Sequence, residues 1–169
     1  MATTTLTDVQ ARWHDVVEDP VLRDLPYKVE TNHRGQLILS PHKNRHSIYQ
    51  GLIEKLLNRY RPEGIVAPEF ALATPHGVKV PDVVWMSPER RAEMEATGDP
   101  STLAPEICVE VLSPGNTPDE IADKRALYRS IGAEEVWIVT DDGQIRFYRD
   151  EEIERSALMP ECPGKVELE

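Results

Sequence analysis

Two carboxylates stand inside apolar segments of this 169-residue chain. Asp82 lies in the run 80–86, which reads VPDVVWM, and Glu110 lies in the run 106–112, which reads EICVEVL. Burying an unpaired charge is costly, so each carboxylate needs a partner. A divalent cation is the simplest shared partner, because Mg²⁺ takes oxygen ligands and keeps several of its waters. The two segments therefore predict a metal site built on Asp82 and Glu110.

Both segments are rich in β-branched and aromatic residues, which predicts β-strands. Successive side chains of a strand point to opposite faces, so Asp82 shares a face with Val84, and Glu110 shares a face with Cys108. Both faces of both segments are otherwise apolar. This pattern is typical of central strands that are covered on both sides.

A lysine follows on a predicted helix. Thr117-Pro118 supplies an N-cap and a first helical residue, and Glu120 stands at the capping-box position. At helical periodicity, Lys124 falls on the same side as Ile121 and Tyr128, where an apolar residue is expected. Its stem could cover apolar surface while its ammonium reaches water. Alternatively, it could serve the two carboxylates.

Several motifs follow one another along the chain: Tyr27 to Pro41, Pro81-Asp82, Glu110-Val111-Leu112-Ser113-Pro114, Lys124, Tyr128, Gly132 and Val136-Trp137-Ile138-Val139. In this order and spacing, they resemble the Uma-two-type restriction endonuclease family of the PD-(D/E)XK nuclease superfamily. The resemblance extends over most of the chain. It implies an α/β (α+β) fold with a restriction-endonuclease-like core, a curved mixed β-sheet flanked by helices, in one domain over residues 1–169.

The resemblance implies a metal-dependent endonuclease that hydrolyses DNA phosphodiester bonds. Asp82 and Glu110 would hold Mg²⁺ or Mn²⁺, and Lys124 would orient or activate water or steady the transition state. The superfamily's usual Glu-x-Lys motif would place lysine at position 112, where this chain has Leu112. In the Uma-two-type group the lysine comes from the helix, which fits Lys124. Glu120 stands where that group usually has Asp.

A third carboxylate is a candidate metal ligand. Residues 65–73 read as a strand, and Thr74-Pro75-His76-Gly77 turns the chain towards Asp82. An antiparallel pairing through this short turn places Glu69 opposite Asp82. Glu69 then joins the site if its side chain takes the same face, and a slip of one residue turns it away.

The net charge of −11 opposes simple nucleic-acid binding, because phosphate contacts dominate that affinity. Up to Arg61 the chain has nine Lys and Arg against seven Asp and Glu, a balance of +2. The remainder has ten against twenty-three, a balance of −13. A DNA-facing surface is therefore expected in the first third, with Lys43, Arg45 and His46 as candidate phosphate contacts. Ordinary solvated charge near a helix end is the alternative.

The sequence also bears on where in the cell the protein is expected. No apolar run reaches the roughly 18 residues of a membrane span, and the first residues lack a signal-peptide pattern. Two cysteines make no disulfide framework, so a cytoplasmic protein is expected. DNA is the expected partner, and a homodimer would suit cleavage of both strands.

Two other interpretations stay open. The chain could be a non-catalytic protein-interaction module with an inherited nuclease fold, which its acidity favours. Alternatively, Asp82 or Glu110 could form a buried salt bridge with Lys124 and hold no metal. Loss of Asp82 would then strongly destabilise the protein. A metal site predicts instead that Asp82→Ala preserves the metal-free stability, because it relieves repulsion between the carboxylates.

Overall fold

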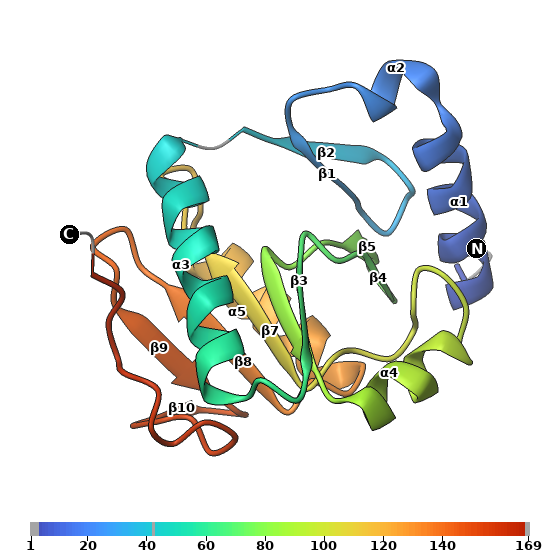
Figure 1. Cartoon of the computed structure of the whole chain (residues 1–169). Helices are drawn as coiled ribbons and strands as arrows, with labels where there is room; N and C mark the ends of the chain where they lie inside the picture. Colours follow the sequence, from blue (N-terminus) through green and yellow to red (C-terminus); the bar gives the residue numbers. More distant parts are fainter. Residues whose placement is uncertain (1–3, 42, 168–169) are drawn as a thin grey trace.

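The computed structural model describes residues 4–41 and 43–167, and a six-stranded mixed sheet forms its centre (Figure 1). Strands β7 and β8 are parallel, and the other neighbouring pairs are antiparallel. This confirms the predicted mixed sheet. In spatial order the strands are β10 (Glu152–Ile153), β9 (Ile145–Tyr148), β8 (Glu135–Val139), β7 (Ile107–Val111), β6 (Val83–Met86) and β3 (Ile65–Pro68).

Two helices cover the two faces of this sheet. Helix α3 (Asn44–Tyr60) packs Ile53 and Leu57 against one face, and helix α5 (Pro118–Ser130) packs Tyr128 against the other (Figure 1). The predicted flanking helices are therefore confirmed. No helix in the described ranges is long and apolar enough to cross a membrane.

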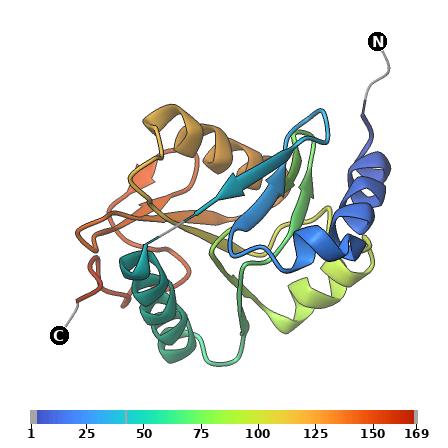
Figure 2. The same ribbon diagram turned by 90° about the horizontal axis from the view of Figure 1, so that it is seen from above.

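A second layer lies beside one edge of the sheet (Figure 2). It contains the hairpin β1–β2, the hairpin β4–β5 and α1, with β1 in contact with β5 and α1 in contact with β4 and β5. The short helices α2 and α4 complete the chain. These elements are α1 (Leu6–Glu18), α2 (Pro20–Arg23), β1 (Lys28–Thr31), β2 (Leu37–Ser40), β4 (Leu72–Thr74), β5 (Gly77–Lys79) and α4 (Pro88–Glu95).

Two predicted strands are divided in the structure. The segment 65–73 breaks at Glu69, whose φ of 46° lies in the left-handed region, and β4 then joins a separate two-stranded sheet. The segment 80–86 becomes regular only from Val83, since Pro81 has no N–H to donate. Backbone pairing nevertheless continues past the break, because Glu69 N–H donates to the Asp82 carbonyl at 2.9 Å.

Sequence signals at the start of α5 are confirmed. Thr117 caps the helix through its side chain, and the Glu120 side chain accepts from the Thr117 N–H in a reciprocal capping box. This fixes where α5 begins. Lys124 is thereby placed about two turns into the helix, beside the sheet.

The packing of α3 can be tested with Leu57→Ala. Leu57 is fully buried beside the sheet, so the variant should lose about 2–5 kcal/mol of unfolding free energy. Leu39→Ala is the control, because Leu39 is 45% exposed on β2. It should stay within about 0.5 kcal/mol of the wild type. Urea denaturation measures both, and equal losses would contradict this packing.

Candidate active site

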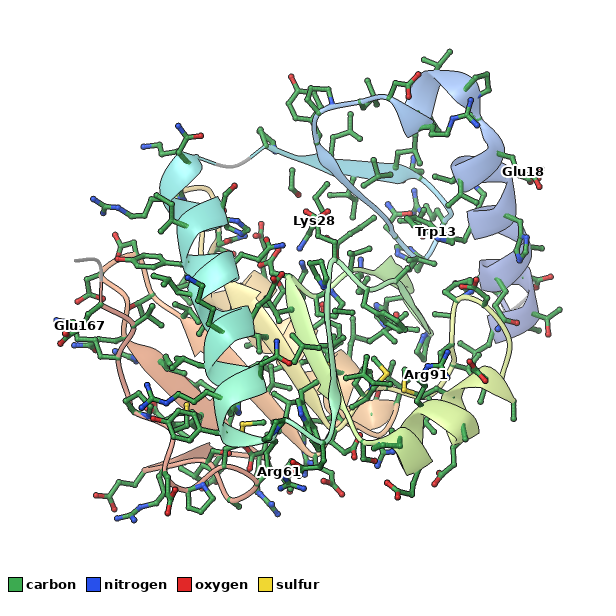
Figure 3. The ribbon with its side chains drawn as sticks, in the orientation of Figure 1. Trp13, Glu18, Lys28, Arg61, Arg91 and Glu167 are labelled. Carbon is green, nitrogen blue, oxygen red and sulfur yellow. The ribbon has the colours of Figure 1, made fainter. Side chains whose placement is uncertain are left out.

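Asp82 and Glu110 converge on one cation. Asp82 directly precedes β6, Glu110 is the fourth residue of β7, and both side chains are almost fully buried. The ammonium of Lys28 lies 3.1 Å from Asp82 Oδ1 and 3.5 Å from Glu110 Oε2. Figure 3 shows Lys28 between the β1–β2 hairpin and the central strands. The two carboxylates thus share the Lys28 ammonium.

Sequence reasoning missed Lys28, although one signal was present. Lys28 and Glu30 stand two residues apart on β1 and therefore on the same face of the strand. The Lys28 side chain is only 7% exposed, and Glu30 is buried. Two opposite charges on one face of a half-apolar strand could have indicated an inward-facing polar surface. Their partner was hidden, because Lys28 and Asp82 are 54 positions apart.

Lys124 reaches the site from α5. Its ammonium lies 3.5 Å from Glu110 Oε1 and 3.1 Å from Glu30 Oε1. The side chain is 18% exposed, so it is less enclosed than Lys28. Glu120, which could have paired with Lys124 one turn away, is exposed and caps the helix instead.

Further hydrogen bonds hold the two carboxylates in place. The Tyr128 hydroxyl donates to Glu110 Oε1 at 2.5 Å. Val111 N–H donates to Asp82 Oδ2 at 2.8 Å, and His46 Nε2 lies 3.2 Å from the same oxygen. Each carboxylate therefore has a fixed oxygen held by the protein core and another oxygen turned towards Lys28.

Glu30 extends the site into a row of alternating charges. Its carboxylate accepts from Val80 N–H at 2.6 Å and from Lys124. Ion pairs then connect side chains in the order Glu30, Lys124, Glu110, Lys28 and Asp82. We call these five side chains the charged row. With three carboxylates and two ammonium groups, the charged row has a formal charge of −1. Such buried ion pairs are often no more stabilising than apolar side chains, so their presence favours a functional role.

The surroundings shift the pKa values of Asp82 and Glu110 in opposite directions. Burial acts to raise the pKa of Asp82, but the His46 hydrogen bond, Lys28 and Val111 N–H together hold it below its usual range. Burial raises the pKa of Glu110; Lys124 and Lys28 offset this only in part, while Asp82 adds to it. Asp82 is thus the more firmly ionised of the pair.

The same charges shift the pKa values of Lys28 and Tyr128. Burial acts to lower the pKa of Lys28, but Glu110, Asp82 and Glu30 raise it overall. Burial and then Glu110 raise the pKa of the Tyr128 hydroxyl well above its usual value. Lys28 therefore stays charged, and Tyr128 stays a proton donor to Glu110.

Lys28 changes the expectation for metal-free stability. The predicted benefit of Asp82→Ala depended on repulsion between two carboxylates that face each other. In the structure an ammonium lies between them, and Val111 N–H also depends on Asp82. Loss of Asp82 is now expected to be destabilising whether or not the site binds metal, so this test no longer separates the two interpretations.

The other candidate site residues differ in how far their side chains are exposed to solvent. Glu69 lies opposite Asp82 in the backbone pairing, as expected, but its side chain is exposed while Asp82 is buried. Its role as a third metal ligand stays a prediction. Lys43 and Arg45 are exposed at the start of α3, and His46 is buried against Asp82. Their proposed phosphate contacts also stay predictions.

The donor set of the site suits a hard divalent cation. Asp82 and Glu110 supply oxygens that already converge on a positive charge. Among residues 4–41 and 43–167, no three His, Cys, Asp or Glu side chains are grouped to hold a metal ion. Mg²⁺ is commonly held by one or two carboxylates together with water and substrate phosphate, which matches a two-carboxylate site.

A family model described as "Putative restriction endonuclease", Uma2, matches residues 20–164, which include every member of the charged row. The chain belongs to the Uma2 family. The resemblance seen in the sequence motifs is thereby confirmed, and Uma2 membership supports a nuclease-like role.

A solved structure agrees with this assignment at the level of fold. It is described as a "putative nuclease belonging to DUF820" from Anabaena variabilis ATCC 29413. The two chains are 19% identical and align with a TM-score of 0.58 over 78% of this chain and 79% of the other. At 19% identity, this similarity shows that the two proteins share a fold. No curated protein matches the chain.

Tyr128→Phe tests how firmly Glu110 is held. Removing the hydroxyl leaves a buried carboxylate without its shortest donor, so the unfolding free energy should fall by about 1–3 kcal/mol. Tyr148→Phe is the control, because its hydroxyl makes a 3.4 Å contact to exposed Glu152. It should change the stability by less than about 0.5 kcal/mol. Similar losses in both variants would show that the Tyr128 hydroxyl does not support Glu110.

The pH dependence of stability should distinguish Asp82 from Glu110. A lowered folded-state pKa stabilises above the unfolded value, about 3.9 for aspartate, and this contribution is lost as the pH falls. The stability advantage of wild type over Asp82→Asn should therefore shrink below about pH 4. Glu110→Gln is the matched comparison with opposite sign, because the raised pKa of Glu110 favours stability at low pH. Chemical denaturation from pH 7 to 3 measures both, and parallel curves would contradict the assignment.

Proposed function

We propose that this protein is a metal-dependent endonuclease that hydrolyses phosphodiester bonds in DNA with Mg²⁺ or Mn²⁺. The observation that carries the proposal is the convergence of two buried carboxylates, Asp82 and Glu110, on one cation position. Membership of a family whose model is described as "Putative restriction endonuclease" supports the choice of DNA as substrate.

Asp82 and Glu110 would hold the metal. When bound, the ion would polarise the scissile phosphate and lower the pKa of a bound water. The Tyr128 hydroxyl already holds one oxygen of Glu110, and Val111 N–H already holds one oxygen of Asp82. The two carboxylates are therefore oriented before any metal binds. Such preorganisation is what a site needs to stabilise developing charge.

Lys124 would offset negative charge on the reacting phosphate or orient the attacking water. It is adjacent to Glu110 and partly open to solvent, so a substrate could approach it without disrupting the sheet. Glu30 acts as a positioning residue, because both of its oxygens lie within 3.2 Å of the Lys124 ammonium.

DNA would approach near the start of α3. Lys43 and Arg45 are exposed there, and His46 connects the same turn of helix to Asp82. We assign Lys43 and Arg45 to phosphate contacts, with His46 nearest the reacting group. Two copies of the chain acting together would cut both strands of a duplex.

A non-catalytic interaction module is the second candidate. It is favoured by the net charge of −11 and by Lys28, which pairs with both carboxylates without a metal ion. Metal binding separates the two candidates, since a module that only binds another protein has no use for an open metal site.

Calorimetric titration with Mn²⁺ tests the metal centre directly. Wild type should bind in a saturable manner, and Asp82→Asn should bind at least about tenfold more weakly, because it loses a charged oxygen ligand. Glu63→Gln is the control, since it removes an exposed carboxylate that is paired with Arg61. Absence of binding both in wild type and in Lys28→Met, which lacks the ammonium between the carboxylates, would favour the interaction module.

Plasmid cleavage in the presence of Mn²⁺ tests the role of Lys124. Lys124→Met should lower the single-turnover rate by about 10²–10³-fold, the usual effect of losing one charge-stabilising group. It should still bind Mn²⁺, because the two carboxylate ligands remain. Lys55→Met, which removes an exposed lysine of α3, should cleave like wild type. Equal rates in both variants would remove Lys124 from the mechanism.

A further inference from the structure

We propose that the Lys28 ammonium is a built-in counter-ion that competes with a divalent cation for the position between Asp82 and Glu110. This inference rests on the proposed function and adds a control on when the site accepts metal. In the metal-free protein the Lys28 ammonium pairs with both carboxylates. Metal binding requires its ammonium to leave them.

The geometry supports competition rather than shared occupancy. Lys28 Nζ contacts Asp82 Oδ1 and Glu110 Oε2, whereas Asp82 Oδ2 and Glu110 Oε1 are held by Val111 N–H and the Tyr128 hydroxyl. The oxygens that face the shared position are therefore the ones that Lys28 uses. A metal ion there would repel an ammonium at hydrogen-bonding distance, because both are positive.

Lys28 can leave the position without unfolding its strand. Its ammonium is carried on a flexible four-carbon stem, which can change rotamer while β1 stays paired with β2. Thr31 holds the same strand to β5, since its hydroxyl accepts from Val78 N–H and its carbonyl accepts from Lys79. The lysine is therefore the movable part of a fixed hairpin.

Displacement would also change the charge that a substrate meets. The charged row carries a formal charge of −1, from three carboxylates and two ammonium groups. Adding a divalent cation makes it +1, while Lys28 remains on β1 beside the site. A phosphodiester is thus repelled by the empty site and attracted by the loaded one. This ordering suits a strongly acidic protein that must bind DNA.

The test is calorimetric titration of Mn²⁺ into wild type, Lys28→Met and Lys79→Met. Lys28→Met should bind at least about tenfold more tightly, because the wild-type site is competent only in the fraction of molecules whose Lys28 has moved away. Lys79→Met is the matched control. Lys79 is also buried beside the site, on β5, but its ammonium donates to the Thr31 carbonyl. Its Mn²⁺ affinity should stay within about threefold of wild type.

Two further variants separate charge from packing. Lys28→Arg keeps the positive charge and should bind Mn²⁺ no more tightly than wild type. Lys28→Gln removes the charge but keeps a polar side chain, so it provides the same test as Lys28→Met if that variant does not fold. Thermal melts give an independent readout. The uncharged variants should melt below wild type without metal and gain more stability than wild type from Mn²⁺.

The outcomes distinguish this inference from the proposed function. Tight binding by the uncharged variants, with weak binding by wild type and Lys28→Arg, supports competition. Equal or weaker binding by the uncharged variants overturns it, while the metal centre stands if Asp82→Asn still binds Mn²⁺ more weakly than wild type. Absence of Mn²⁺ binding in wild type and in every Lys28 variant overturns both.

Discussion

The need to compensate two buried carboxylates governs the arrangement of this protein. Asp82 and Glu110 lie at adjacent central strands, where water cannot solvate them. Elements from distant parts of the sequence therefore supply their partners: β1 provides an ammonium, α3 an imidazole, and α5 an ammonium and a hydroxyl. Without these partners the same strands would bury uncompensated charge, which is strongly destabilising.

This compensation is an inefficient way to stabilise a fold. The surrounding sheet is held by apolar contacts such as those of Val83, Phe147 and Leu57, which need no charged partner. Apolar side chains in place of the whole charged row, its two lysines included, would need none of these partners. The charges are better explained by the chemistry that they permit, with the rigid sheet and its hydrogen bonds keeping them at a fixed separation.

The site also gives a physical account of the chain's acidity. A protein of net charge −11 does not attract DNA through its overall field. The first third of the chain, residues 1–61, instead has a positive balance of +2, and it supplies Lys28 beside Asp82 and the exposed Lys43 and Arg45 at the start of α3. Recognition of a phosphodiester would then depend on local charge at the site, and the surrounding acidic surface would discourage non-specific binding.

The sequence by itself determined the local features. Apolar runs of β-branched residues indicated the strands that carry Asp82 and Glu110, and the Thr117–Glu120 capping box defined the start of α5. Periodicity placed Lys124 on the buried side of that helix. These features follow from interactions between residues close in the chain, which is why they could be predicted.

Only the tertiary structure decided which charges meet. Lys28 and Glu30 enter the site because the β1–β2 hairpin lies beside the sheet, and nothing local to residues 28–30 specifies the strand that they will face. Likewise, the turn in the backbone at Glu69 keeps its pairing with Asp82 but leaves its side chain exposed. Alternation along a strand defines its two faces, but the element that covers each face is selected by packing across the whole chain.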